Sequence, residues 1–339
     1  GSEMCIRDRY AGQAAVHTSG ALDAAVLEPA RAAGTQLGSF HPMVAFASQE
    51  AAVRSLPNAT IAVEGDEELV AQLAQLATDI GAQPVRLPPT GKTAYHAAAV
   101  LAGGGVIGLL DGVAEVARGA GLDEAGALAI YVPLIRQALA NAESMGVGEA
   151  LTGPFVRGDV GTVRNHLAAM SRLAPGALEM YRATAKRELQ LAVARGAIDE
   201  DQAAPLRALL GGLATDIGAQ PVRLPPTGKT AYHAAAVLAG GGVIGLLDGV
   251  AEVARGAGLD EPGALAIYVP LIRQALTNAE HMGIEKALTG PFVRGDVGTV
   301  RDHLAALARL APGALELYRA TARRELALAV HRGELDEAQ

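Results

Sequence analysis

The stretch LATDIGAQPVRLPPTGKTAYHAAAVLAGGGVIGLLDG occurs twice in this chain, at residues 76–112 and again at residues 213–249. The match continues beyond it, so that Leu76–Gln202 repeats as Leu213–Gln339 with about sixteen differences over 127 positions. Each residue of the second copy has a number 137 higher than its equivalent in the first. A repeat of this length is a whole domain, because solenoid units span only about 20–50 residues.

Each copy has the pattern of an all-helical domain. Strand signals end at Pro88-Pro89, and apolar residues then recur at helical spacing. In the second predicted helix, Leu128, Tyr131, Val132, Ile135 and Leu139 form an i, i+3, i+4, i+7, i+11 stripe that is typical of a core-facing surface. The predicted helices are Thr93–Arg118, Asp123–Met145, Gly158–Leu173, Pro175–Arg195 and Asp199–Leu210.

Three consecutive glycines, Gly103-Gly104-Gly105, lie inside the first of these helices. Each glycine costs a helix interior up to about 1 kcal/mol relative to alanine. We therefore expect a compensating feature at this point, either close helix–helix packing, which we favour, or room for a ligand.

The segment before the repeat alternates strand and helix patterns. Strands are predicted at Ala14–Thr18, Leu37–Phe40, Thr60–Val63 and Pro84–Leu87, and helices at Ala21–Ala33 and Glu67–Ile80. Such alternation with short loops predicts a parallel, doubly wound sheet. Only the later half of that sheet is expected, and the second copy has no such segment of its own.

Composition excludes several classes of protein. The formal net charge is −8 and no basic stripe is present, which argues against nucleic-acid binding. The most apolar helix, Ala97–Val116, contains Asp111 and Glu115, so no membrane span is expected. The first residues lack the basic and apolar runs of a secretory signal, so a cytoplasmic location is expected. Cys5 is the sole cysteine, which excludes disulfide and thiolate–metal frameworks.

The first eight residues, Gly1-Ser2-Glu3-Met4-Cys5-Ile6-Arg7-Asp8, resemble the translation of a transposase adapter used in preparing sequencing libraries. Residues 1–9 are therefore interpreted as an artefact, with a natural polar tail as the alternative. The unequal duplication has two explanations, a partial gene duplication or a mis-joined assembly, of which we favour the second. The remaining chain divides into residues 10–90, 91–212 and 213–339.

Several motifs occur in an order that resembles one known family. The chain is similar to the Rossmann-like oxidoreductases with a C-terminal domain of unknown function, number 2520. The matching motifs are His17-Thr18-Ser19-Gly20, Gly38-Ser39-Phe40-His41-Pro42-Met43, Glu64-Gly65-Asp66, Tyr95-His96-Ala97-Ala98-Ala99, Ala150-Leu151-Thr152-Gly153-Pro154 and Arg157-Gly158-Asp159.

This resemblance implies the fold class α/β plus all-α. A partial Rossmann-like parallel sheet would precede two copies of a helical domain like the C-terminal domain of 6-phosphogluconate dehydrogenases. The resemblance also implies dimerisation through that domain, but no substrate. A homodimer, or a pseudo-dimer of the two copies within one chain, is therefore expected.

The chain departs from the family in two places. The glycine-rich loop that opens the first βα unit and accepts the pyrophosphate is absent. We therefore expect NAD(P) as the cofactor of the intact parent and little dinucleotide affinity in this chain. Relatives also place an Asn in the first long helix, where this chain has Gly104 and Gly241.

Lys92, His96 and His41 are the candidate catalytic residues. Lys92 and His96 stand at i and i+4 on one helix face, and related hydroxyacid dehydrogenases place a catalytic lysine at this junction, where an ammonium can polarise a carbonyl group or relay a proton. His41 follows a strand and His17 ends one, and strand ends in doubly wound sheets point at the ligand crevice. His17 and Ser19 are the candidate cofactor-binding residues. The alternatives are a solvated lysine and hydrogen-bonded core histidines.

The candidate substrate-binding residues are Arg157, Thr152, Asp159 and Asn141. Arg157 could bind a substrate carboxylate with two hydrogen bonds or could pair with Asp159. Asp159 could instead cap the helix that it precedes, and His166, on the same helix face, is interpreted as structural. The histidines do not have the spacing of a zinc site, so no metal is expected.

Two functions remain open at this point. The first is a fragment of an NAD(P)-dependent oxidoreductase for a small carbonyl or imine substrate, inactive here because the glycine-rich loop is missing. The alternative is a non-enzymatic helical dimerisation or binding module.

Overall fold

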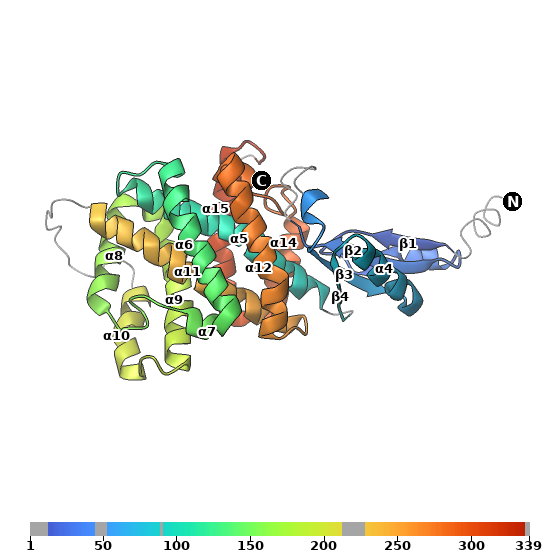
Figure 1. Cartoon of the computed structure of the whole chain (residues 1–339), viewed down its shortest axis with the longest axis horizontal. Coiled ribbons are helices and arrows are strands. Elements are labelled where there is room, and N and C mark those ends of the chain that lie inside the picture. The colour runs from blue at the N-terminus through green and yellow to red at the C-terminus, as the bar shows by residue number, and fades with distance from the viewer. Residues whose placement is uncertain (1–12, 45–52, 89–90, 212–227, 336–339) are drawn as a thin grey trace.

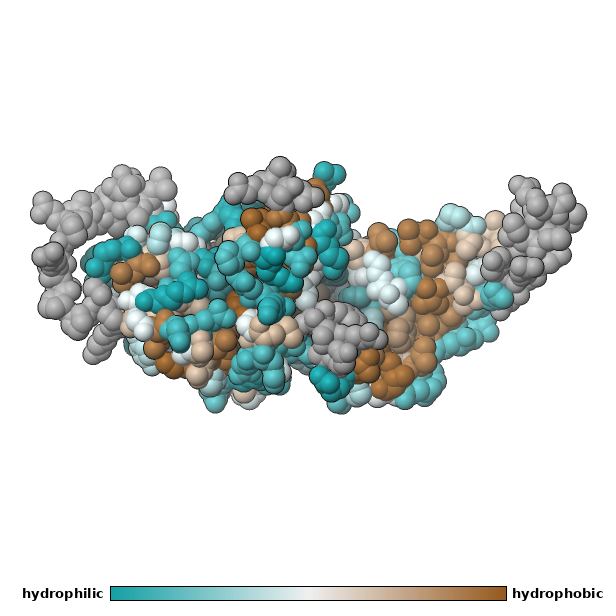
Figure 2. Space-filling view, turned by 90° about the horizontal axis from the view of Figure 1, so that it is seen from above, coloured by the Kyte–Doolittle hydropathy of each residue, from teal (hydrophilic) through white to brown (hydrophobic). Residues whose placement is uncertain are grey.

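The computed structural model of the protein describes residues 13–44, 53–88, 91–211 and 228–335. A small sheet unit lies at one end of an elongated molecule, and a helical body makes up the rest (Figure 1 and Figure 2). The interpretation of residues 1–9 as an artefact, with Cys5, falls outside the described residues, as do residues 213–227 of the second copy.

The sheet has four strands in the order β1-β2-β3-β4. The pairs β1 (Ala14–His17) with β2 (Gln36–Pro42) and β3 (Thr60–Gly65) with β4 (Gln83–Arg86) are parallel, but β2 and β3 are antiparallel. The prediction of a sheet followed by helical domains is confirmed, and the prediction that the sheet is wholly parallel is wrong.

The two parallel pairs have connections that contain helices. Parallel neighbours need a crossover of about a dozen residues or more, usually containing a helix. Helix α4 (Glu67–Asp79) provides it between β3 and β4, and η1 (Ala24–Leu27) with α2 (Glu28–Arg31) provides it between β1 and β2. In the described part of the β2–β3 connection, only residues 53–55 are helical.

The two faces of the sheet have different neighbours. On one face, Ile61 and Val63 form a small core with Leu69 and Leu73 of α4. On the other face, Ala62 joins the large core of the helical body. Because side chains alternate along a strand, Ser39, His41 and Glu64 also face the body.

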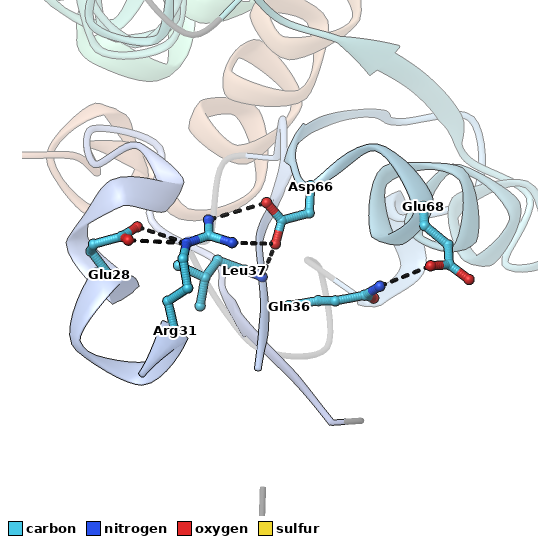
Figure 3. A network of polar contacts seen from close by, with 6 residues as sticks. All are labelled: Glu28, Arg31, Gln36, Leu37, Asp66 and Glu68. Atoms are coloured by element: carbon cyan, nitrogen blue, oxygen red, sulfur yellow. Dashed lines mark hydrogen bonds and ion pairs between the residues drawn. The ribbon is translucent and has the colours of Figure 1, made fainter. Parts of the chain in front are cut away.

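A surface network of polar contacts links two helices of this unit to β2 (Figure 3). The Arg31 guanidinium donates to both carboxylate oxygens of Asp66 at 3.1 Å and also to Glu28, and the Leu37 amide donates to Asp66 at 2.9 Å. Gln36 donates to Glu68 at 3.0 Å. The Arg31 guanidinium holds the pKa of Asp66 below its usual value. The network ties α2, β2 and the start of α4 together.

The helical body follows the repeat. The first copy contains α5 (Lys92–Arg118), α6 (Glu124–Met145), α7 (Val147–Ala150), α8 (Val160–Leu173), η2 (Pro175–Ala177), α9 (Leu178–Ala194) and α10 (Glu200–Gly211). The second contains α11 (Gly228–Gly256), α12 (Glu261–Met282), α13 (Ile284–Ala287), α14 (Val297–Leu310), η3 (Pro312–Ala314) and α15 (Leu315–His331). The predicted helices of the first copy are confirmed to within two residues at nearly every end.

The long central helix of each copy packs against the other copy. Helices α5 and α11 lie against each other, α5 also packs on α12, α14 and α15, and α11 packs on α6, α8 and α9. The polar contacts come in equivalent pairs. The Tyr131 hydroxyl donates to the Tyr232 carbonyl at 3.1 Å, as that of Tyr268 does to the Tyr95 carbonyl.

Two arginines with largely shielded side chains repeat this pairing. Arg324 binds Asp111 and Glu115 of α5, and Arg187 binds Asp248 and Glu252 of α11. These equivalent ion pairs give the two copies matching contacts across the body.

The glycines inside α5 allow α15 to approach closely. A Cβ on Gly104 would lie 2.8 Å from the carboxyl carbon of Glu325, and one on Gly108 would lie 3.3 Å from the Thr321 carbonyl oxygen. The favoured interpretation of the glycines, close helix packing, is confirmed. The spacing Gly103-x-Gly105-x-x-Gly108 resembles a dinucleotide fingerprint, but it lies within a helix and not in a turn after a strand.

Helices α5 and α11 are long and apolar enough to cross a membrane, by length and composition alone. Most of the apolar window of each is buried inside the protein, where the two helices form the centre of the body. Burial in the core accounts for their composition.

Candidate functional site

A buried lysine lies where the sheet meets the start of α5. Lys92 is 2% exposed, its Nζ donates to the Ser39 hydroxyl, and the same atom lies 3.4 Å from Glu64 Oε2. Ser39 and Glu64 are direct neighbours in the β2–β3 pairing, and Glu64 Oε1 accepts from the Ala24 amide at 2.8 Å. Burial lowers the pKa of Lys92, and the Glu64 carboxylate opposes this shift.

Two histidines from different segments lie beside this lysine. The His41 ring, on β2, is 5.9 Å from that of His96 on α5 and 6.1 Å from that of Tyr95, in edge-on arrangements. Among the described residues, no group hydrogen-bonds to the buried His41 Nδ1. Burial, and secondarily the Lys92 charge, lower the pKa of His41 to about 4, so its ring is neutral near pH 7.

His96 continues into a chain of hydrogen bonds to the second copy. Its Nδ1 is 2.8 Å from His303 Nε2, and His303 Nδ1 is 2.8 Å from the Tyr318 hydroxyl. Burial lowers the pKa of His303 to about 4, and burial and then His303 lower that of His96 well below its usual value. Burial raises the pKa of Tyr318, which stays a phenol.

Gly20 brings the loop after β1 against both rings. A Cβ at this position would lie 2.5 Å from His96 Cδ2 and 2.6 Å from His41 Nε2. Any side chain at residue 20 would therefore displace one of the imidazoles.

A pocket of about 320 Å³ opens beside the lysine, at the carboxyl ends of β3 and β4. It is lined by Glu64, Gly65, Arg86, Leu87 and Pro88. Glu64 Oε2 is buried and forms an ion pair with Lys92 but no hydrogen bond among the described residues. Glu64 thus connects the pocket to the buried lysine. Ligands of open α/β sheets bind at such carboxyl ends.

The structure brings together Lys92, His96 and His41, the three candidate catalytic residues. It does not bring the candidate substrate anchors of the first copy to them. Asp159 caps α8 by accepting from the Thr162 amide at 2.9 Å, and Arg157 and Thr152 are exposed nearby. The helix that they precede faces α11, where His166 Nε2 is 2.8 Å from His233 Nδ1.

The repeat equivalents of these anchors take their place. Arg294 and Asp296 precede α14, which packs on α5, and Arg294 is one of the charges that lower the pKa of His96, after burial, His303 and His41. The cause is the exchange of central helices between the copies. A site on the start of α5 faces the loop before α14 and not the loop before α8.

The remaining candidates lie at the edge of the site or away from it. His17 Nε2 is 2.9 Å from the Asp23 carbonyl oxygen, and Ser19 Oγ accepts from the Leu22 amide, so both shape the loop that carries Gly20. Asn141 accepts from Gln137 on α6, a helix of the first copy that packs mainly on α11, and no hydrogen bond among the described residues links it to the sheet junction.

Sequence reasoning missed five residues of this site: Ser39, Glu64, Arg294, His303 and Tyr318. Ser39 and Glu64 stand in quoted motifs, and their alternation with the apolar residues of β2 and β3 is the signal that could have found them. No sequence signal distinguishes His303 from His166, because the two copies share that motif.

The described residues do not fit a dinucleotide or a metal ion. β3 leads through Gly65 into α4, but Asp66, Glu67 and Glu68 make the start of that helix acidic and unfavourable for a pyrophosphate. The glycines of suitable spacing in α5 pack against α12 and α15. In the same part of the chain, no three His, Cys, Asp or Glu side chains are grouped so as to hold a metal.

Comparison with known proteins identifies the repeat. A family model described as a domain of unknown function, DUF2520, matches residues 59–188 and again residues 197–325. Both matches end at the buried glutamate of the last long helix, Glu188 or Glu325. No curated protein and no solved structure matches the chain.

Proposed function

The chain belongs to the family defined by DUF2520, a domain that it carries twice, and we propose that the junction of sheet and α5 binds a small carbonyl or imine compound. NAD(P) would supply the reducing chemistry in the intact parent, and the described residues of this chain offer no site that fits it. This chain retains the polar side of the site, so it binds and polarises the substrate without reducing it.

The convergence of Lys92, His41 and His96 carries this proposal. An ammonium and an imidazole N–H, largely shielded from water, donate strong hydrogen bonds to a carbonyl oxygen or an imine nitrogen. Glu64 compensates the charge of Lys92 and lines the adjoining pocket of about 320 Å³, a volume in the range of small-ligand sites. Arg86 also lines this pocket, but its guanidinium already donates to both carboxylate oxygens of Glu67, so a substrate carboxylate would have to displace Glu67 to bind it.

A second candidate function is a helical binding module, favoured by the reciprocal contacts of the two copies. In that interpretation the copies form a pseudo-dimer within one chain. The equivalent pairs Arg187–Asp248 and Arg324–Asp111 support it. The polar groups at the sheet junction would then stabilise the docking of the sheet and bind no ligand.

Titration of histidine-labelled protein with pyruvate, a small 2-oxo acid, distinguishes the two. We expect saturable shifts of the His41 and His96 resonances at millimolar pyruvate, lost in Lys92→Met, with His166 and His233 unchanged. NADPH is expected to shift none of them. Pyruvate without effect on His41 and His96 would favour the binding module.

A further inference from the structure

Three side chains form a continuous line from α15 to the sheet junction. Tyr318 contacts His303 within the second copy, and His303 contacts His96 on α5 of the first. The two imidazole rings are 4.9 Å apart, and His303 and Tyr318 are almost completely buried. The contacts among these three side chains therefore determine which ring nitrogen of each histidine carries a hydrogen.

The buried phenol fixes the first hydrogen. Among the residues that the structure describes, the Tyr318 hydroxyl has one hydrogen-bond partner, His303 Nδ1. A buried O–H group without an acceptor is strongly unfavourable, so the hydroxyl donates to Nδ1. His303 then carries its own hydrogen on Nε2.

The hydrogen on His303 Nε2 in turn determines the protonation of His96. His303 Nε2–H points at His96 Nδ1 at 2.8 Å, so Nδ1 accepts and His96 carries its hydrogen on Nε2. The opposite arrangement, with each ring protonated on Nδ1, would leave the Tyr318 hydroxyl hydrogen without an acceptor among the described residues. An imidazolium at His96 would put two hydrogens into one contact, which agrees with the lowered pKa of this ring.

We propose that His303 and Tyr318 hold His96 in the tautomer with hydrogen on Nε2, so that His96 presents an N–H donor to the sheet junction. The second copy is thus part of the site on the first. His303 and Tyr318 are positioning residues, and His96 is the group that donates to the carbonyl oxygen or imine nitrogen. The role of His96 rests on the proposed function, but its tautomer does not.

The other half of the molecule contains a matched control. Tyr181, His166 and His233 repeat the line, with 2.9 Å from Tyr181 Oη to His166 Nδ1 and 2.8 Å from His166 Nε2 to His233 Nδ1. His233 is exposed, whereas His96 is packed against Gly20 and His41. The same substitution can therefore be made in a line that does not lead to the sheet.

Nitrogen NMR of histidine-labelled protein tests the tautomer directly, because protonated and unprotonated ring nitrogens resonate far apart. In the wild-type chain, we expect His96 to be protonated on Nε2 and unprotonated on Nδ1. In Tyr318→Phe, the His303 and His96 signals should move to values averaged over both tautomers. Tyr181→Phe should leave them unchanged and move those of His166 and His233.

His303→Gln and His303→Leu provide a second measurement. The glutamine amide can still donate to His96 Nδ1 and should keep the Nε2–H tautomer, and leucine should release it. A wild-type His96 protonated on Nδ1, or His96 signals that do not respond to Tyr318→Phe, would overturn the proposal. A pyruvate titration that fails while the tautomer is as expected would overturn only the proposed function.

Discussion

The two halves of the helical body share their sequence but not their surroundings. Tyr95 is 0% exposed beside the sheet, and its repeat equivalent Tyr232 is 46% exposed. Leu271 of α12 is 5% exposed, and its equivalent Leu134 of α6 is 38% exposed. By contrast, His166 and His303, and likewise Glu188 and Glu325, are almost completely buried in both halves.

This difference separates what the repeat determines from what the sheet adds. Contacts between the copies bury the two histidines alike and the two glutamates alike, because each copy offers the other the same helices. Tyr95 loses its contact with water because His41 and the rest of the sheet unit lie against the start of α5. A site environment can therefore differ between two nearly identical sequences in one chain.

The largest difference is expected for the paired tyrosines. Tyr95→Ala removes a fully buried aromatic ring and should lower the free energy of unfolding by about 3–5 kcal/mol. Tyr232→Ala should lower it by less than about 1 kcal/mol, because the ring is half exposed. Urea denaturation of both variants measures the difference. Equal losses of unfolding free energy would show that the sheet unit does not make Tyr95 more important for stability than Tyr232.

The paired arginines should behave alike. Arg187→Met and Arg324→Met each leave two carboxylates without their cation. The expected loss of unfolding free energy is about 2–3 kcal/mol in each, below that of a fully buried pair because the carboxylates are partly exposed. A clear inequality in urea denaturation would contradict the equivalence of the contacts between the copies.

The buried glutamates predict how stability falls with rising pH. Burial raises the pKa of Glu325 to about 8 and that of Glu188 well above its usual value. Between the unfolded and the folded pKa, the folded state binds protons that the unfolded state has already lost. The contribution of these protons to the free energy of unfolding is therefore fully present below the unfolded pKa, and that of Glu325 is lost as the pH rises towards 8. The slope is at most about 1.4 kcal/mol per pH unit for each proton.

Glu325→Gln should flatten this alkaline loss, measured as the urea midpoint between neutral pH and pH values above that pKa. Glu316→Gln, at an exposed glutamate of the same helix, is the control and should leave the profile unchanged. The buried histidines act in the opposite direction. The pKa values of His41, His166 and His303, lowered to about 4, make stability fall as the pH drops from about 6.5 towards 4.

The smallest effect is expected for two exposed arginines. Arg294→Ala and Arg157→Ala should each change the free energy of unfolding by no more than about 0.5 kcal/mol. Arg294→Ala should nevertheless raise the pKa of His96 in an NMR titration, because one nearby positive charge is removed. An equal rise of the His96 pKa in Arg157→Ala would contradict the account, because it would mean that Arg157 of the first copy lies as near to His96 as Arg294 does.

The sequence predicted the positions of helices and strands better than it predicted which of them pack or pair together. Apolar spacing predicted the ends of α5 and α6 to within one residue, because a buried helix face requires apolar residues at helical spacing in the local sequence. The antiparallel pairing of β2 and β3 was missed, since strand direction depends on the path of a connection. His303 and Arg294 were missed for another reason. Their equivalents His166 and Arg157 belong to the same motif in the first copy. The sequence alone therefore does not decide which histidine and which arginine lie beside α5.

Cysteine cross-linking tests the exchange of helices most directly, in a chain whose own Cys5 is replaced by serine. A Cβ on Gly105 would lie 3.3 Å from Thr321 Cγ2, which is compatible with the short Cβ–Cβ distance of a disulfide. We expect Gly105→Cys with Thr321→Cys to form a disulfide within a single chain, and Gly105→Cys with Thr184→Cys, inside one copy, to form none. A disulfide in the second variant and none in the first would contradict the account.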